Sequence, residues 1–458
     1  MASALVRLLP FEMALLGLLE LALLFALILM LLTEGGPALL LSSTDLPHDC
    51  LILAAMLAVT IAATAATIGL YRPEVCLNRG RFLLTGTITA LVAFPAILLV
   101  SGANRMTLSS EHIVWLARLL LIWLPCVLLV RLALSSLAAR VPVARRVLIV
   151  GEGTRAAGLR QRLAEKRHAL FRPIDPEAAA RHDHTNQGTG LSARSVRDQH
   201  VWGIVIAEDE PAPDAHHALL DNKLRGVPVF SDLSFQEHHL GRIELDAIDA
   251  NWLLFADGFQ NGVLSRGCKR VFDVAVGLTL TIVTLPLMLI AAAAIKLDSR
   301  GPVLYRQERT GLHGEPFTLF KFRSMAMDAE ASGKPQWAQK LDPRITRIGA
   351  FIRASRIDEL PQLLNVLRGE MSMTGPRPER PMFVHELAAV IPFYNHRCYV
   401  KPGLTGWAQV HYPYGASVED AREKLAYDLY YVKNRGMLLD TVILLATVRV
   451  ILFGEGAR

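Results

Sequence analysis

Four long apolar stretches in the first third of the chain constrain its fold more than any other feature. They run roughly over Phe11–Leu32, Leu51–Leu70, Phe82–Val100 and Ile113–Leu134. Each is about as long as the 20 residues with which an α-helix crosses a bilayer core of about 30 Å. The chain is 52% hydrophobic and 20% charged, and its charges concentrate after this region. We therefore expect a membrane protein of mixed class, with a four-helix transmembrane bundle over residues 1–140.

Charges in the short connections predict the orientation of this bundle. Two connections are rich in arginine: Arg72, Arg79 and Arg81 follow the second stretch, and Arg140, Arg145 and Arg146 follow the fourth. The other two connections carry acidic residues and a single arginine. Because positively charged loops stay in the cytoplasm, we expect the N-terminus and everything after residue 140 on the cytoplasmic side of a multi-pass protein.

The net charge of +6 fits phospholipid surfaces and phosphorylated substrates. No stripe of lysine and arginine interleaved with aromatic residues is present, so we expect no nucleic-acid partner. The five cysteines are widely scattered and form no Cys-x-x-Cys pair or Cys/His cluster. We therefore expect neither a structural zinc site nor a disulfide framework.

Residues 141–262 are expected to form a Rossmann-like cytoplasmic α/β domain. Arg145–Val150 is typical of a strand, and a glycine-rich turn and a helix through about Leu163 follow it. Val201–Ala207 and Gly226–Phe230 are typical of two further strands, and the helix expected between them predicts that the strands are parallel. Gly158 comes two residues too late for the dinucleotide fingerprint, so we interpret the turn as a packing feature, with nucleotide binding as the alternative.

A fifth apolar stretch, Ala275–Ile295, contains Pro286 near its middle. Lysine and arginine flank it on both sides, whereas a spanning helix should be positive mainly at its cytoplasmic end. Since proline removes a backbone hydrogen bond and kinks a helix, we expect a re-entrant helix over about residues 271–297 that breaks at Pro286. A full crossing is the alternative, and it would place the domain at 263–458 outside the cell.

The C-terminal region, expected to be mainly helical, contains the adjacent carboxylates Asp358 and Glu359. Planar arginine side chains suit diphosphate oxygens, and two carboxylates can share Mg²⁺ or supply a nucleophile. The residues alone do not separate these two roles, and a salt-bridged helix surface is the structural alternative. Arg353 and Arg356 have the i, i+3 spacing of one helix face. The cations expected to bind substrate phosphate are Lys321, Arg323, Arg353, Arg356, Arg377 and Lys401.

Three features further along complete the expected catalytic domain. The loop from Lys401 to Val410 is rich in glycine, and its Lys401 and Trp407 are candidates for contact with phosphate and with a ring. Tyr427, Tyr430 and Tyr431 are interpreted as packing or interfacial residues rather than substrate contacts. The last apolar run, Met437–Phe453, predicts an amphipathic helix on a membrane or domain surface.

Six motifs, taken in chain order, resemble those of the bacterial sugar transferases, the monotopic phosphoglycosyl transferases that begin exopolysaccharide, capsule and O-antigen assembly. The resemblance covers roughly Lys269 to the C-terminus, and the upstream regions are similar to the long form of the family. The motifs are Arg270-Val271-Phe272-Asp273, Gly301-Pro302-Val303-Leu304-Tyr305-Arg306-Gln307, Lys321-Phe322-Arg323-Ser324-Met325, Asp358-Glu359-Leu360-Pro361-Gln362, Gly375-Pro376-Arg377-Pro378 and Lys401-Pro402-Gly403-Leu404-Thr405-Gly406.

The resemblance implies a two-step transfer of a hexose 1-phosphate at the cytoplasmic face of the bacterial inner membrane. Asp358 would attack the β-phosphate of a UDP-sugar and release UMP, and undecaprenyl phosphate would then accept the phosphosugar. Glu359 would be the Mg²⁺ ligand, and Arg323 and Arg377 would neutralise phosphate charge. The family's membrane helix is also broken at a proline. A serine often precedes that proline, but Leu285 stands here, so Thr284 is the candidate for bonding to the backbone.

Several alternatives stay open at the level of sequence. Glucose and galactose are both candidate sugars. The oligomeric state is undecided, and a homodimer is one candidate. A membrane-bound nicotinamide-dependent epimerase or dehydratase would use the turn at Gly151, but the fingerprint spacing and a suitable Tyr-x-x-x-Lys pair are missing. A non-catalytic assembly scaffold or transporter would leave the C-terminal cluster of cations and carboxylates unexplained.

Overall fold

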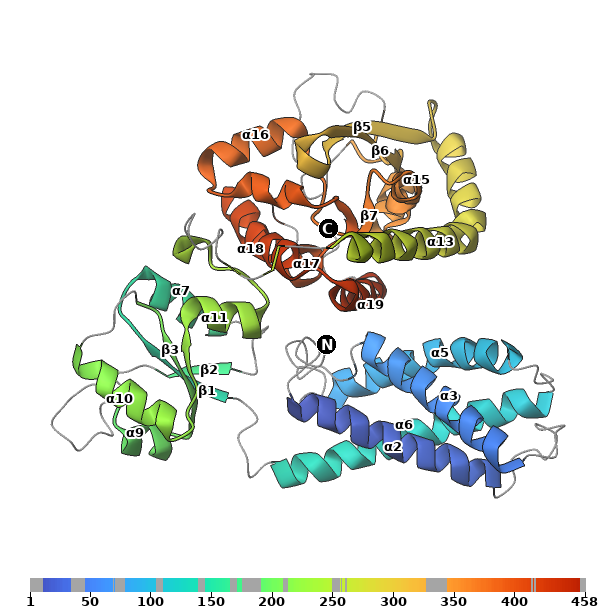
Figure 1. Ribbon diagram of the computed structural model, residues 1–458. Coiled ribbons are helices and arrows are strands. Elements are labelled where there is room, and N and C mark those ends of the chain that lie inside the picture. Colours follow the sequence, from blue (N-terminus) through green and yellow to red (C-terminus); the bar gives the residue numbers. More distant parts are fainter. Residues whose placement is uncertain are drawn as a thin grey trace. The chain divides into compact units, whose positions relative to one another are not determined.

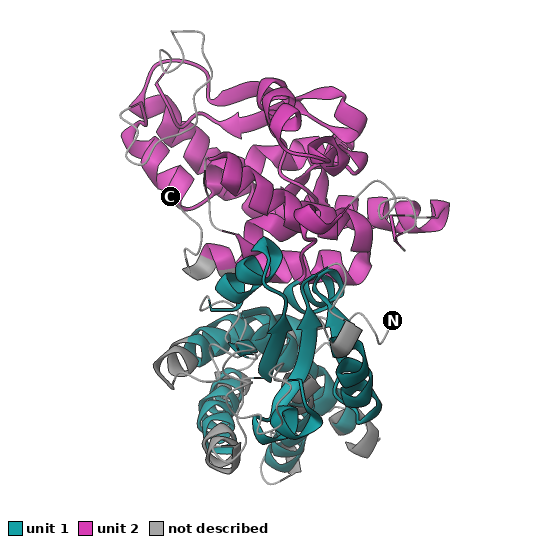
Figure 2. Ribbon diagram, turned by 90° about the vertical axis from the view of Figure 1, so that its left-hand side faces the viewer, with its two compact units in different colours: residues 1–240 teal, residues 241–458 magenta. Residues whose placement is uncertain are grey.

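The computed structural model describes residues 11–33, 46–68, 70, 79–103, 110–138, 145–164, 171–174, 191–208, 213–248, 256, 258–259, 262–326, 344–412, 415 and 417–453. The chain divides into two compact units, Met1–Leu240 and Gly241–Arg458, shown in teal and magenta in Figure 2. The second unit therefore begins before residue 263, where the sequence suggests the catalytic domain. The division of the chain into three domains at 140 and 262 stays a prediction.

The first unit begins with four apolar helices, in blue to cyan in Figure 1. Ile28, Ile61, Ile97 and Leu119 are fully buried where these helices pack, while many other leucines point outward. Three described helices are long and apolar enough to cross a membrane: α3, α6 and a helix of the second unit, α13. Such helices fit a membrane protein. The bounds are α2 (Phe11–Thr33), α3 (Leu46–Ile68), α5 (Arg79–Ala103) and α6 (Ser110–Ala138).

A four-stranded, entirely parallel sheet follows, with the strand order β2-β1-β3-β4. This confirms the predicted strands and their parallel pairing, and it adds β2, which the sequence pattern did not indicate. Buried aliphatic side chains line both faces of the sheet, as parallel strands require. The bounds are β1 (Arg145–Val150), α7 (Thr154–Ala164), β2 (Phe171–Ile174), α9 (Ala193–Asp198), β3 (Val201–Ile206), α10 (Pro213–Leu224), β4 (Val229–Ser231), α11 (Asp232–Phe235) and the π-helical turn η2 (Gln236–Leu240).

The turn after β1 is a close packing contact between two strand ends. Gly151 has a φ of +127°, which favours glycine, and a Cβ at this position would lie 3.1 Å from the carbonyl oxygen of Ala207. Ala207 also donates its backbone N–H to the carbonyl oxygen of Val150, at 2.8 Å. Tight packing therefore explains this glycine, in agreement with the packing interpretation of the sequence.

The second unit is mainly helical, with one antiparallel hairpin, β5–β6, and one short parallel pair, β7–β8. Its elements bring segments far apart in the chain together around the hairpin and the pair. The bounds are η3 (Leu245–Ala247), α13 (Val263–Asp298), β5 (Leu304–Thr310), η4 (Leu312–Gly314), β6 (Pro316–Phe322), α14 (Arg347–Ala354), η5 (Ile357–Gln362), α15 (Leu363–Arg368), β7 (Ser372–Thr374), α16 (Pro381–Val390), η6 (Tyr394–Tyr399), β8 (Gly403–Thr405), α17 (Trp407–His411), α18 (Val418–Asn434) and α19 (Met437–Phe453).

Helix α13 contains Pro286 and is continuous through it, so the predicted break is a bend. Figure 1 shows its second half, in yellow, running in a different direction from its first half. A proline removes one backbone hydrogen bond and pushes on the preceding turn, which kinks a helix without ending it. The hydroxyl of Thr284 donates to the carbonyl oxygen of Leu280 at 2.7 Å, which confirms the predicted backbone bond of Thr284.

Both halves of α13 pack on the same unit. Asp273 in the first half is buried against β7, and Ala291 and Ile295 in the second half pack on the core beside Phe322. Between these two contacts, Ile282 and Val283 are exposed, together with most apolar side chains around them. The helix thus contacts one unit near both of its ends and exposes an apolar middle, and its re-entrance stays a prediction.

Candidate active site

The Asp358–Glu359 pair lies on a 3₁₀ turn rather than on a continuous helix. Thr346 caps α14 by accepting the N–H of Gly349 at 2.9 Å, and the helix ends at Ala354. Arg356 then adopts a left-handed conformation with φ 60°, and η5 begins after it. The expectation that Arg353 and Arg356 share one helix face is therefore wrong, because the chain turns between them.

Glu359 is the centre of a cluster of cations. Its Oε1 lies 2.7 Å from NH2 of Arg377, 3.2 Å from Nζ of Lys321 and 3.6 Å from NH1 of Arg356. Burial alone would raise the pKa of Glu359, but the charges of Arg377, Lys321 and Arg356 outweigh it and hold the pKa well below its ordinary value. The ionised form of Glu359 is therefore favoured, and three cations balance its charge.

Asp358 behaves in the opposite way although it is the next residue. Its side chain is buried, and no hydrogen bond to it is found among the described residues. Burial raises its pKa above the ordinary value; the nearby charge of Lys321 opposes this shift and that of Glu359 adds to it. Two neighbouring carboxyl groups whose pKa values are pushed apart are suited to different tasks. The group with the raised pKa is the more basic one, and no hydrogen-bonding side chain within the described ranges occupies it.

The turn that carries Arg377 is held on both sides. Gly375 donates its N–H to the carbonyl oxygen of Thr405, and Gly403 donates its N–H to that of Pro376, each at 2.9 Å. A Cβ on Gly375 would lie 2.4 Å from the carbonyl oxygen of Lys401, so only glycine fits there. This confirms the Gly-Pro-Arg-Pro segment as a fixed turn, and the guanidinium of Arg377 reaches Glu359 from it.

Arg397 and Asp428 support this turn, and the sequence reasoning missed both. Arg397 donates NH2 to the carbonyl oxygen of Arg377 at 3.0 Å and pairs with Asp428 at 2.8 Å. Both side chains are buried, and the hydroxyl of Tyr394 accepts from NH1 of Arg397 at 2.9 Å. A carboxylate within the aromatic run Tyr427–Tyr431 was the available signal, since such a residue is rarely buried without a partner.

The remaining predicted cations divide between the site and its surroundings. Arg353 lies near enough to lower the pKa of Asp358 by its charge. Arg323, in contrast, donates to the carbonyl oxygens of Ser299 and Arg300 at 2.8 and 3.0 Å, where it fixes the end of α13. Lys401 lies beside Arg270 and Asp273 rather than beside Glu359. The structure therefore brings Lys321, Arg353, Arg356 and Arg377 to the pair, and its contacts place Arg323 and Lys401 elsewhere.

The aromatic candidate Trp407 is a packing residue, and so are the three nearby tyrosines. Trp407 is buried, and its Nε1 donates to the carbonyl oxygen of Gly241 at 2.6 Å. It stacks on Tyr430 with ring centroids 5.6 Å apart, so its ring is not open to a substrate. Tyr427, Tyr430 and Tyr431 are buried as well, which confirms the packing interpretation of these tyrosines.

One further cation borders the site without having been expected there. Arg309, on β5, donates NH1 to the carbonyl oxygen of Pro378 at 3.1 Å and lies 3.5 Å from Glu379. Burial lowers its pKa; the charge of Glu379 opposes this shift and that of Arg377 adds to it. The hairpin β5–β6 therefore supplies two cations, Arg309 and Lys321, to the region around Glu359.

The carboxylates present fit a magnesium ion only together with a substrate. Among the described residues, no group of three or more His, Cys, Asp or Glu residues could hold a metal. The cation contacts of Glu359 all end on Oε1, which leaves its Oε2 and the Asp358 carboxylate as oxygen donors. Mg²⁺ ordinarily takes one or two carboxylates and completes its shell with substrate phosphates and water. Glu359 Oε2 and the Asp358 carboxylate supply the one or two protein carboxylates that such an ion needs.

Comparison with known proteins identifies the C-terminal region. The family model for bacterial sugar transferase matches residues 264–454. A UDP-N-acetylgalactosamine-undecaprenyl-phosphate N-acetylgalactosaminephosphotransferase from Aeromonas hydrophila is 40% identical over 55% of this chain and 59% of its own length. An undecaprenyl-phosphate glucose phosphotransferase from Komagataeibacter xylinus is 33% identical over 69% of this chain and 60% of its own length.

A third relative is covered more fully. A UDP-glucose:undecaprenyl-phosphate glucose-1-phosphate transferase from Caulobacter vibrioides is 46% identical over 41% of this chain and 71% of its own length. The chain thus spans about three fifths of the first two relatives and more than two thirds of this one. The ordered motifs, the family model and these relatives agree, and the chain belongs to the bacterial sugar transferase family.

Proposed function

We propose that this protein transfers a hexose 1-phosphate from a UDP-sugar to undecaprenyl phosphate, releasing UMP and forming an undecaprenyl diphosphate-sugar. One observation carries the proposal: Asp358 has no hydrogen-bond partner among the described residues and lies beside Glu359, whose charge three cations neutralise. Such a pair offers a nucleophile next to an excess of positive charge, which is what attack on a diphosphate requires.

In the first step, a carboxylate oxygen of Asp358 attacks the β-phosphorus of the UDP-sugar. The bond from that phosphorus to the bridging oxygen breaks, and UMP leaves with the electron pair of that bond. An acyl phosphate now joins Asp358 to the sugar phosphate. The guanidinium of Arg377 and the ammonium of Lys321 stabilise the negative charge that develops on the phosphate oxygens.

In the second step, a phosphate oxygen of undecaprenyl phosphate attacks the same phosphorus. The bond between phosphorus and the Asp358 oxygen breaks, and the carboxylate is restored. The lipid phosphate must approach from the membrane surface, and the exposed apolar middle of α13 would place the site at that surface. Because a carboxylate is a good leaving group from phosphorus, one residue serves both steps.

Mg²⁺ is the proposed cofactor, held by Glu359 Oε2 and Asp358 with oxygens of the substrate. When bound, it would withdraw charge from the diphosphate and orient it. Arg377, Lys321 and Arg356 hold Glu359 in one position, so that its second oxygen faces a fixed direction. Arg353 adds positive charge on the Asp358 side, which favours the ionised form of that carboxyl group.

The wider assignment follows from the family and the sequence. The reaction would be the first membrane step of exopolysaccharide, capsule or O-antigen synthesis, at the cytoplasmic face of the bacterial inner membrane. The names of the relatives support a nucleotide-sugar donor and undecaprenyl phosphate, and they favour glucose or N-acetylgalactosamine as the sugar. The parallel sheet is assigned as a Rossmann-like domain, the four N-terminal helices as a transmembrane bundle in the lipid bilayer, and a homodimer as one candidate assembly.

A UMP-release assay tests this function. Purified protein in membranes containing undecaprenyl phosphate is given UDP-glucose, UDP-galactose and UDP-N-acetylgalactosamine in turn. We expect UMP from at least one of them, and we expect Asp358→Asn to lower the rate at least about 1,000-fold, since an amide is not a nucleophile at this phosphorus. Asp221→Asn, an exposed change in the first unit, is the matched control and should keep full activity. Full activity of the Asp358→Asn variant would overturn the nucleophile assignment.

A further inference from the structure

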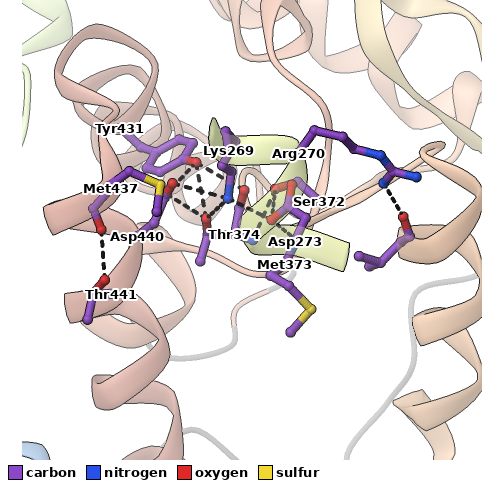
Figure 3. A network of polar contacts seen from close by, with 11 residues as sticks. Lys269, Arg270, Asp273, Ser372, Met373, Thr374, Tyr431, Met437, Asp440 and Thr441 are labelled. Carbon is purple, nitrogen blue, oxygen red and sulfur yellow. Dashed lines mark hydrogen bonds and ion pairs between the residues drawn. The ribbon is translucent and has the colours of Figure 1, made fainter. Parts of the chain in front are cut away.

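A second buried cluster of charges lies outside the proposed site, where α13, β7, α18 and α19 meet. Lys269 donates to Asp273 Oδ1 at 2.9 Å and to Thr374 Oγ1 at 2.8 Å, and its Nζ forms an ion pair with Asp440 Oδ2 at 3.1 Å (Figure 3). Tyr431 reaches Asp440 Oδ1 at 2.8 Å and the carbonyl oxygen of Thr374 at 3.0 Å. We call these five residues, together with Ser372, the clamp.

The clamp joins four elements through side chains at fixed spacings. Lys269 and Asp273 are four residues apart on α13 and share one helix face. Ser372 and Thr374 are two residues apart on β7, so their hydroxyls point to one side of the strand. Asp440 lies in the first turn of α19, where the helix dipole favours a negative charge. Each side chain is therefore presented to the same point by ordinary helix or strand geometry.

The clamp is more polar than the attachment of a helix requires. Asp273, Tyr431 and Asp440 are each at most 3% exposed, and two carboxylates with one ammonium occupy their common centre. Apolar side chains of similar volume often stabilise a protein as well as a buried ion pair does. A buried, fully satisfied polar network instead fixes one arrangement of its members, because any shift leaves charged groups unpaired. The clamp therefore acts mainly by fixing the positions of its side chains, and less by adding to the stability of the fold.

Thr374 is the link between the clamp and the proposed site. It is held by Lys269, Tyr431 and Asp440, and it immediately precedes the fixed turn that carries Arg377. Since that turn is bonded to β8 on its other side, a displacement of β7 moves the Arg377 backbone with it. The guanidinium of Arg377 lies 2.7 Å from Glu359, and shifts of about 1 Å in such groups can change rates about 100-fold.

We propose that Lys269, Tyr431 and Asp440 are positioning residues for the reaction, which hold Thr374 and through it set Arg377 against Glu359. This rests on the proposed function, because Arg377 is assigned there to the substrate phosphates. The clamp also fastens the first half of α13 to β7. The membrane-associated helix and the phosphate-binding arginine are thereby set relative to one another by one group of side chains.

A double-mutant cycle between the clamp and Arg377 tests the proposal. Asp440→Asn keeps the shape of the side chain and its acceptor oxygen for Tyr431 but removes the charge that faces Lys269. Tyr431→Phe keeps the buried ring and removes only the hydroxyl, and it serves if Asp440→Asn fails to fold. Each is combined with Arg377→Lys, and kcat and KM are measured with the UDP-sugar that the unaltered chain uses fastest. Thr441→Val, an exposed change in the same helix, is the control.

We expect each clamp variant to lower kcat about 10-fold or more when Arg377 is present, and less than about 2-fold when Lys replaces it. Equal losses in both backgrounds would show that the clamp acts on general stability, and unchanged rates in both would show that it is not needed; either result overturns the proposal. The affinity for inorganic pyrophosphate gives a second readout of the same cycle. If the unaltered chain releases no UMP, the proposed function fails, while the pyrophosphate cycle still decides whether the clamp sets Arg377.

Discussion

The two buried charge clusters of the catalytic unit differ in how their charges balance. Around Asp358 and Glu359 lie four cations: Lys321, Arg353, Arg356 and Arg377. In the clamp, one lysine faces two carboxylates, and the neighbouring hydroxyls and a backbone N–H complete their hydrogen bonds. The first cluster has more positive than negative charges, and the second cluster has no such excess.

This difference separates a site from a scaffold. Lys321, Arg356 and Arg377 are partly exposed, and their charges outnumber the two carboxylates, so a polyanion such as the proposed diphosphate would be attracted to the first cluster. The clamp is complete by itself and leaves no group available for a ligand. Charged residues in the same unit therefore indicate binding where cations are partly exposed and in excess, and fixed geometry where the carboxylates are buried and paired.

The largest expected contrast is between Arg377→Ala and Asp273→Ala. Removing Arg377 relieves part of the excess charge, so we expect a loss of about 100-fold or more in kcat/KM with little change in unfolding temperature. Removing Asp273 leaves Lys269 short of one partner and Ser372 and the Met373 N–H without their acceptor, which should lower the free energy of unfolding by roughly 3 kcal/mol. Rates and thermal unfolding in detergent measure both. A reversal of this pattern would contradict the division into site and scaffold.

A smaller effect should appear in the pH dependence of the Lys321→Met variant. The rate requires ionised Asp358, so activity falls as the pH falls through the pKa of that group, which burial raises. Lys321 lowers this pKa by its charge, and removing it should raise the pKa further. The acidic limb of the normalised rate profile should therefore move to higher pH. Glu359 loses one of the charges that lower its pKa in this variant, but those of Arg377 and Arg356 remain to hold that pKa below its ordinary value.

Lys223→Met, an exposed change on α10, is the matched control for this profile. It removes one positive charge from the first unit and should leave the acidic limb where it is in the unaltered chain. A limb that moves to lower pH in the Lys321→Met variant, or does not move at all, would mean that another group than Asp358 controls the profile.

Sequence patterns predicted the elements whose cause is local. The apolar stretches, three of the four strands of the parallel sheet, a distortion at Pro286 and the bounds of the last helix, Met437–Phe453, follow from composition, period and proline chemistry. The turn that holds Arg377 was also expected, because glycine and proline restrict it locally. Each of these features depends on a few residues close together in the chain.

Features that depend on distant partners were not predictable in this way. Arg323 has the same chemistry as Arg377, and only its contacts with Ser299 and Arg300 show that it fixes the end of α13. The left-handed turn at Arg356 interrupts a spacing that suggested one helix. The clamp joins residues more than 160 positions apart along the chain, from Lys269 to Asp440. Neither propensity nor local motif carries that information, since tertiary packing decides it.

The central claim is that Asp358 forms a covalent phosphosugar, and the mass of the protein tests it most directly. The protein is incubated with the UDP-sugar that releases UMP, in the absence of undecaprenyl phosphate, and then digested and analysed by mass spectrometry. The account predicts that the peptide containing Asp358 gains the mass of the sugar phosphate of that UDP-sugar, and that undecaprenyl phosphate removes it. UMP release without any added mass on that peptide, or an adduct on Glu359 instead, would contradict the account.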